Sequence, residues 1–203
     1  QICHPGIAKG RPPGILPPMK PNAPTPCVFF DRDGIVNHPP DDERRYVLHE
    51  DEFELLPGFV ESLRIVLERG YKAVIVTNQA GVSRGRMSQA DLDRIHAKLR
   101  RLLREQGLTL HDILECTSFD DAHPNRKPNP GMLLEAATRH HLDLSRSWMI
   151  GDNEKDVTAG RRAGVLKTVK VKRSSSPTHA DHRVDSMIEL SALLLAHLPT
   201  VTH

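Results

Sequence analysis

The stretch "VFFDRDGIVN" (residues 28–37) joins a short apolar run to two aspartates, Asp31 and Asp33, that lie two positions apart. The apolar run has the composition of a buried β-strand. In open α/β sheets, ligands bind beyond the carboxyl ends of the strands. The stretch therefore predicts a strand that delivers two carboxylates to one site.

Apolar runs of strand length alternate with amphipathic segments of helix length along the rest of the chain. This alternation is typical of an α/β protein with a parallel sheet. We expect a three-layer, Rossmann-like α/β sandwich with strand order 5-4-1-2-3, right-handed crossovers and no large cap domain. The expected strands are 27–30, 72–78, 112–119, 147–152 and 167–171, and the expected helices are 57–70, 88–107, 131–141, 156–164 and 185–198.

Two segments stand apart from this alternation. Residues 1–26 are rich in proline, which cannot sustain a helix or a ladder, so we expect an N-terminal arm followed by one folded domain at residues 27–203. Residues 34–55 are mostly polar and too short for a domain of their own. We expect them to form a flap over the pocket.

The composition limits the class of protein. A chain of 203 residues with 38% hydrophobic residues can bury one substantial core. A net charge of +2 and an aromatic content of 4% argue against a surface that binds nucleic acid. No run approaches the roughly 18 apolar residues of a membrane span. Three cysteines cannot all pair, which fits a reducing compartment, so we expect a cytoplasmic protein. We also expect a monomer with a small-molecule substrate.

Polar side chains gather where the expected strands end. Carboxylates that converge on one pocket repel one another, so such a cluster is stable mainly with a cation among them. Ligands that are all oxygen favour a hard ion, and we expect Mg²⁺. The residues concerned are Asp31 and Asp33 after the first strand, Thr77, Asn78 and Gln79 at the second, Asp152 after the fourth, and Lys127 before the third helix.

A free carboxylate beside a hydroxyl, a lysine and a metal ion suits phosphoryl transfer. The carboxylate attacks phosphorus, the lysine and the metal neutralise the equatorial oxygens, and a second aspartate handles the proton. The spacing of Asp31 and Asp33 fits this division, because one side chain can reach phosphorus while the other reaches the leaving oxygen.

The order of these motifs resembles the haloacid dehalogenase (HAD) superfamily: Asp-x-Asp-Gly at 31–34, Thr77, Lys127 and Gly-Asp-x-x-x-Asp at 151–156. Longer stretches, "DRDGIVN", "VTNQAGVSRG" and "RKPNPGM", are similar to the D-glycero-D-manno-heptose 1,7-bisphosphate phosphatases and the related histidinol-phosphate phosphatases. The resemblance implies an Mg²⁺-dependent phosphomonoester hydrolase that acts through an aspartyl-phosphate. The C7 phosphate of the heptose bisphosphate is the first expected target, and histidinol phosphate is the alternative.

The resemblance also implies a role for each matching residue. Asp31 is the expected nucleophile and Asp33 the expected general acid and base, assisted by Thr77 and Lys127. The expected metal ligands are Asp31, the backbone carbonyl of Asp33, and Asp152, supported by Asp156; the expected substrate-binding residues are Asn78, Gln79, Arg84 and Arg126.

One segment departs from the family pattern. Relatives commonly carry a structural zinc loop before the Arg-Lys-Pro motif, whereas this chain has "CTSFDDAHPNRKP". Cys116 matches the first ligand and His123 lies nearby, but Ser118, Pro124 and Asn125 occupy the other positions. Two ligands fall short of the four that structural zinc requires, so we expect no zinc and a reduced loop.

Two further functions are weaker alternatives. A polynucleotide 3′-phosphatase shares this fold, but it needs a basic track with stacking aromatics. A non-catalytic phosphate-binding relative would be expected to have lost Asp31 or Asp33, and both are intact.

Overall fold

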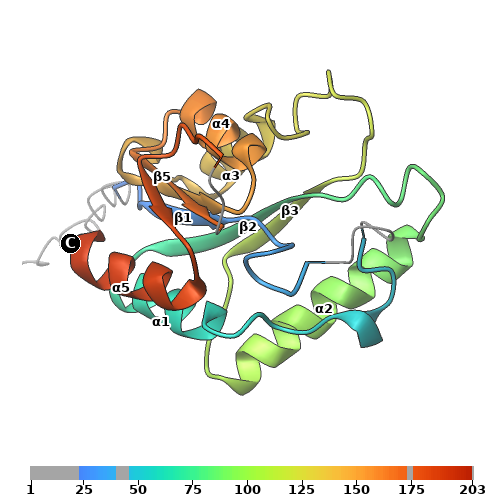
Figure 1. Ribbon diagram of the computed structural model, residues 1–203, viewed down its shortest axis with the longest axis horizontal. Coiled ribbons are helices and arrows are strands. Elements are labelled where there is room, and N and C mark those ends of the chain that lie inside the picture. Colours follow the sequence, from blue (N-terminus) through green and yellow to red (C-terminus); the bar gives the residue numbers. More distant parts are fainter. Residues whose placement is uncertain (1–22, 40–45, 173–175, 203) are drawn as a thin grey trace, which may run out of the picture.

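The computed structural model describes residues 23–39, 46–172 and 176–202. Most of the expected arm at 1–26 therefore lies outside the described residues. Within them, all strands form one parallel sheet with the order β3-β2-β1-β4-β5-β6 (Figure 1). The strands are β1 (Cys27–Phe30), β2 (Lys72–Asn78), β3 (Asp112–Cys116), β4 (Trp148–Gly151), β5 (Lys167–Val171) and β6 (His182–Val184).

Helices cover both faces of this sheet. Figure 1 shows α3 and α4 on one face and α1, α2 and α5 on the other. The same division separates the two hydrophobic clusters of the interior, one beneath each group of helices. None of the helices in the described ranges has both the length and the apolarity to cross a membrane. The helices are α1 (Phe59–Glu68), α2 (Gln89–Glu105), α3 (Gly131–His140), α4 (Glu154–Ala163) and α5 (Met187–His197), with short 3-10 turns η1 (Glu50–Glu52) and η2 (Leu144–Arg146).

The predicted fold is confirmed. The three layers, the parallel sheet and the central order 5-4-1-2-3 are all present, and β6 adds one strand beside β5. β6 has three residues, too few for a detectable apolar alternation. The third strand ends at Cys116 rather than at residue 119, because the chain leaves the sheet there to form the loop that carries Lys127.

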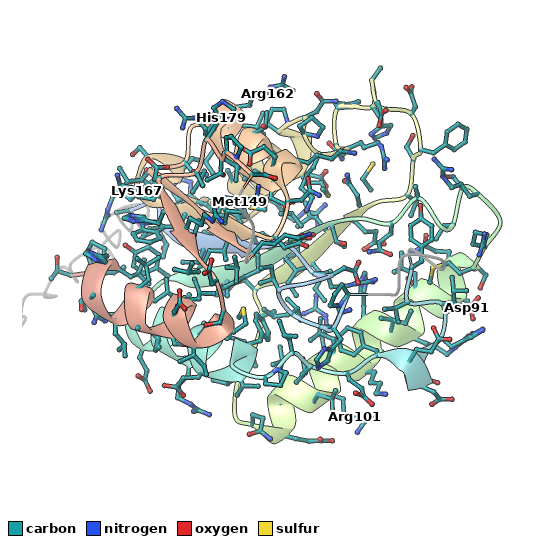
Figure 2. All side chains as sticks on the ribbon, viewed as in Figure 1. Asp91, Arg101, Met149, Arg162, Lys167 and His179 are labelled. Carbon is teal, nitrogen blue, oxygen red and sulfur yellow. The ribbon has the colours of Figure 1, made fainter. Side chains whose placement is uncertain are left out.

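Helix ends follow local capping chemistry. The Ser88 side chain accepts a hydrogen bond from the backbone N–H of Asp91, and the Asp91 carboxylate accepts one from the backbone N–H of Ser88. Figure 2 shows Asp91 at this end of α2. Helix α4 begins at Glu154, two residues before the predicted start, because Asn153 and Asp156 form a second capping box.

The segment 34–55 is only partly a flap. Pro39 and Tyr46 line the pocket at the sheet edge, as expected of a flap. Apolar side chains that alternate with the polar ones are fully buried in the cluster on the α1 face, among them Ile35, Val36 and Phe53. The segment is therefore anchored in the core near its start, at Ile35 and Val36, and near its end, at Phe53.

Candidate active site

The carboxyl ends of β1, β2 and β4 meet at one edge of the sheet. Phe30 pairs with Ile75 of β2 and with Ile150 of β4, and the backbone N–H of Asp31 donates to the carbonyl of Ile150 at 2.9 Å. A pocket of about 650 Å³ opens there. Its lining includes Asp31, Asp33, Thr77, Lys127, Asp152 and Asp156, so the structure brings together all the expected catalytic and metal-site residues.

Lys127 lies at the centre of the buried charges. Its Nζ contacts Asp31 Oδ1 at 2.7 Å and Asp156 Oδ1 at 2.6 Å, and it donates to the carbonyl of Val76 at 2.8 Å. Burial alone would lower the pKa of Lys127, but the carboxylates of Asp156 and Asp31 outweigh burial and raise it. Lys127 is therefore a fixed positive charge at neutral pH.

Three carboxylates form a cluster with the donor chemistry of a hard-cation site. Oxygen atoms of Asp31, Asp152 and Asp156 lie within 4.8 Å of one another. Burial and the neighbouring Asp156 raise the pKa of Asp31 to about 8, although Lys127 opposes them. This raised pKa indicates that Lys127 alone does not balance the cluster, and a cation bound among these oxygens would favour the ionised form of Asp31, so the all-oxygen cluster fits Mg²⁺.

A glycine allows the acidic cluster to sit this close to the first strand. Gly34 has a φ of +87°, and a Cβ at this position would lie 2.9 Å from Cγ of Asp152. A glycine at this place in Asp-x-Asp-Gly therefore satisfies both the left-handed backbone and the approach of Asp152.

The Asp33 carboxylate is held by neutral and positive hydrogen-bond donors. It accepts hydrogen bonds from Arg32 Nη2 at 3.0 Å, from Asn37 Nδ2 at 2.9 Å and from Gln79 Nε2 at 2.8 Å. Burial alone would raise the pKa of Asp33, but Arg32 and the two amides outweigh burial and lower it. The pKa values of Asp31 and Asp33 are thus shifted in opposite directions although the two residues are only two positions apart.

Thr77 and Gln79 form a polar floor beneath the pocket. Gln79 is fully buried, and its Nε2 donates to Thr77 Oγ1 at 2.8 Å as well as to Asp33. The Thr77 hydroxyl accepts this bond, so its own proton is free to point into the pocket. Gln79 is not part of the pocket lining formed by the described residues, and these contacts favour a role in placing Thr77 and Asp33.

The remaining predicted substrate contacts lie at different depths. Asn78 lines the pocket and makes two hydrogen bonds with the backbone of Lys127, at 2.9 and 3.0 Å. Arg126 also lines the pocket, where it pairs with Asp121 at 2.8 Å. Arg84 is exposed and stacks over Phe119, with its Cζ 5.7 Å from the ring centre, outside the lining that the described residues form. Substrate contact by Arg84 stays a prediction.

The loop from Cys116 to Asn129, which we expect to be a reduced zinc loop, is held by side-chain contacts. Cys116 Sγ lies 3.6 Å from His123 Nδ1, and Asn129 Nδ2 donates to the carbonyls of Asp121 and His123 at 2.9 and 3.0 Å. Arg126 Nη1 closes the loop by donating to the carbonyl of Ser118 at 3.1 Å. The absence of zinc stays a prediction.

Known proteins resemble this chain along most of its length. A family model described as HAD-hydrolase-like matches residues 124–190. The D-glycero-beta-D-manno-heptose-1,7-bisphosphate 7-phosphatase of Mesorhizobium japonicum is 33% identical over 96% of this chain and 91% of its own length. The enzyme of the same name from Helicobacter pylori is 39% identical over 68% of this chain and 79% of its own. The chain belongs to the family of the HAD-like heptose-1,7-bisphosphate 7-phosphatases.

A solved structure of the family supports the same assignment. The D,D-heptose 1,7-bisphosphate phosphatase of B. bronchiseptica, crystallised with magnesium and phosphate, has a TM-score of 0.74 and 28% identity over 85% of this chain and 99% of its own. As a member of this family the chain is a phosphatase.

Several residues at the phosphatase site were missed by sequence reasoning. Arg32 and Asn37 lie in the opening stretch, but a single sequence gives no signal that they bind Asp33. Lys172, which lies 3.7 Å from Asp152, follows the fifth strand and could have been found by extending the strand-end argument. Tyr46, Asn153 and Lys155 also line the pocket.

Proposed function

We propose that this phosphatase hydrolyses the C7 phosphate of D-glycero-D-manno-heptose 1,7-bisphosphate. Its curated relatives carry that activity in their names, and the two named above match 96% and 68% of the chain. The observation that carries the proposal is the buried arrangement of Asp31, Lys127 and the acidic cluster, which suits attack on a phosphoryl group. The enzyme acts in the cytoplasm as a monomer.

The rim of the pocket favours a bisphosphate over histidinol phosphate. Arg126, Lys155 and Lys172 line the pocket in addition to Lys127. A second phosphate gains from these cations, whereas the ammonium group of histidinol phosphate is repelled by them. The polar lining also suits the hydroxyl groups of a sugar.

The proposed chemistry has two displacements at phosphorus. Asp33 takes up a proton when the negatively charged substrate binds, because the added negative charge raises its pKa. The Asp31 carboxylate attacks the phosphorus atom, the bond to the sugar oxygen breaks, and Asp33 gives its proton to that oxygen. Thr77 donates to a phosphoryl oxygen, and Lys127 neutralises charge beside Asp31. Asp33 then takes a proton from the water that attacks the aspartyl-phosphate, which releases inorganic phosphate and restores Asp31.

Mg²⁺ would be held by Asp31, Asp152 and the backbone carbonyl of Asp33. Asp156 would orient Lys127 beside these ligands. When bound, the ion supplies positive charge that stabilises the phosphoryl oxygens. Asp156 serves this arrangement in two ways, because it pairs with Lys127 and also accepts a hydrogen bond from the backbone N–H of Asn153 at 3.0 Å.

A substrate panel tests the proposal. Phosphate release should be measured with the alpha and beta anomers of the heptose 1,7-bisphosphate, with histidinol phosphate and with an oligonucleotide that ends in a 3′-phosphate. The heptose bisphosphate should give the highest kcat/KM, and the heptose 1-phosphate should remain. A higher kcat/KM for histidinol phosphate or for the oligonucleotide would overturn the substrate assignment.

A matched pair of variants tests the cationic rim. Lys155→Gln should raise KM for the bisphosphate more than for a monophosphate such as heptose 7-phosphate. Lys167→Gln is the control, since Lys167 pairs with Asp181 at 3.6 Å and is not part of the lining formed by the described residues. Equal changes in KM for both substrates would argue against a second phosphate at this rim.

A further inference from the structure

A polar chain runs from the site through the buried Arg32 and His96 to the partly exposed Glu115 on the α2 face. Arg32 is fully buried, and its Nε and Nη2 face both oxygens of Asp33 at 3.0 to 3.3 Å. Its Nη1 lies 3.4 Å from His96 Nε2 on α2, and His96 Nδ1 lies 3.5 Å from Glu115 Oε2 on β3. Gln89 Nε2 donates to the other oxygen of Glu115 at 3.1 Å.

The protonation of this chain is fixed by its donors. Arginine has no acceptor atom, so His96 Nε2 must accept from Arg32. Burial and the Arg32 charge lower the pKa of His96 to about 3, which keeps the ring neutral. The single ring proton is therefore on Nδ1, the nitrogen that lies 3.5 Å from Glu115 Oε2.

The geometry separates this chain from the substrate. Asp33 and the expected leaving oxygen meet in the pocket, whereas Arg32, His96 and Glu115 are not among its described lining residues. Any effect on catalysis must pass through the Asp33 carboxylate. Asn37 and Gln79 bind that carboxylate with single amides, but Arg32 alone grips both oxygens and so fixes the plane of the group.

Given the proposed function, on which this inference rests, we propose that Arg32, held by His96 and Glu115, is a positioning residue that aims the Asp33 carboxylate at the leaving oxygen. His96 fixes the rotation of the guanidinium by accepting from Nη1, and the Glu115 carboxylate, 3.5 Å from Nδ1, holds the ring in this orientation by electrostatic attraction. Loss of either contact lets the guanidinium rotate and moves the proton donor away from the leaving oxygen.

Leaving-group chemistry distinguishes this role from a merely structural one. A sugar alkoxide is a poor leaving group and depends on the proton from Asp33, whereas 4-nitrophenolate leaves without it. Poor aim of Asp33 therefore lowers turnover of the sugar phosphate and spares 4-nitrophenyl phosphate. A loss of folded protein lowers both rates by the same factor.

The test compares kcat for heptose 1,7-bisphosphate with kcat for 4-nitrophenyl phosphate in wild type, His96→Leu and His96→Gln. The ratio should fall by about tenfold or more in His96→Leu, a part of the ~10²-fold or larger effect of general acid catalysis. His96→Gln should stay within about threefold of wild type, because its amide can accept from Arg32 and donate to Glu115. An unchanged ratio in His96→Leu would overturn the proposal.

Two further variants keep the result decisive. Glu115→Leu replaces a partly exposed side chain and should lower the same ratio if His96→Leu does not fold; an unchanged ratio there overturns the proposal equally. Asp33→Asn separates this inference from its foundation. If Asp33→Asn lowers the ratio and the His96 and Glu115 variants do not, the positioning role alone fails. If Asp33→Asn leaves the ratio unchanged, the proposed acid role fails and the positioning role falls with it.

Discussion

Replacing Lys127 with methionine removes a positive charge that contacts two buried carboxylates. Nζ lies 2.7 Å from Asp31 and 2.6 Å from Asp156, and both the Lys127 and Asp156 side chains are 3% exposed. Breaking a buried ion pair on one side costs about 3–5 kcal/mol, because the partner charge stays buried without compensation. For a chain of this size that corresponds to a fall in Tm of about 6–20 °C.

Magnesium should offset much of this loss. The cation neutralises the same carboxylates, so Lys127→Met should lose most stability in EDTA and clearly less in millimolar Mg²⁺. Thermal unfolding followed by circular dichroism in both conditions measures the difference. Lys167→Met is the matched control, since its ion pair with Asp181 is half-exposed and should be worth about 0–1 kcal/mol. A stability loss for Lys127→Met that equals the control, or that is the same with and without Mg²⁺, would refute the reasoning.

Three other predictions follow from the geometry. Gly34→Ala should raise the Mg²⁺ concentration for half-maximal activity by about tenfold or more, because it displaces Asp152, whereas Gly107→Ala, with a similar positive φ and nothing within 4 Å of its Cβ, should not. Activity should vanish in EDTA and return with Mg²⁺ but not with Ca²⁺, which requires more ligands at longer distances. Burial and the Arg32 charge lower the pKa of His96 from 6.5 to about 3 in the folded state, so the free energy of unfolding should fall by up to about 1.4 kcal/mol per pH unit below pH 6.5. Urea unfolding of His96→Gln should show a shallower fall with pH. Equal slopes for the variant and the wild type would contradict the buried neutral ring.

The fold could be predicted from the sequence because its signals are local. The buried strands are apolar runs, and the helices carry their own caps, as at Ser88 and Asp91. β6 was missed because a three-residue edge strand is specified by pairing with β5 and not by its own pattern. The core anchoring of residues 34–55 was missed because Ile35, Val36 and Phe53 are scattered among charged residues.

The site was predictable to the extent that the strand ends carry it. Asp31, Thr77 and Asp152 meet because parallel strands end at one edge, and this needs only topology. The clamp on Asp33 could not be predicted in the same way, because Arg32 reaches His96 from a position 64 residues away. Gln79 shows the same limit: its residue type suits substrate, and only the fold reveals that its amide faces Asp33 and Thr77.

The covalent step is the central claim, and one measurement tests it most directly. Wild-type protein should be mixed in excess with heptose 1,7-bisphosphate labelled at the C7 phosphate, quenched within one turnover, and the labelled peptide mapped. We predict an acyl phosphate on Asp31 in the wild type and no label in Asp31→Asn. With labelled 4-nitrophenyl phosphate, label should accumulate in Asp33→Asn, because the water that hydrolyses the aspartyl-phosphate then lacks its general base. Label on Asp33, or full turnover by Asp31→Asn, would contradict the account.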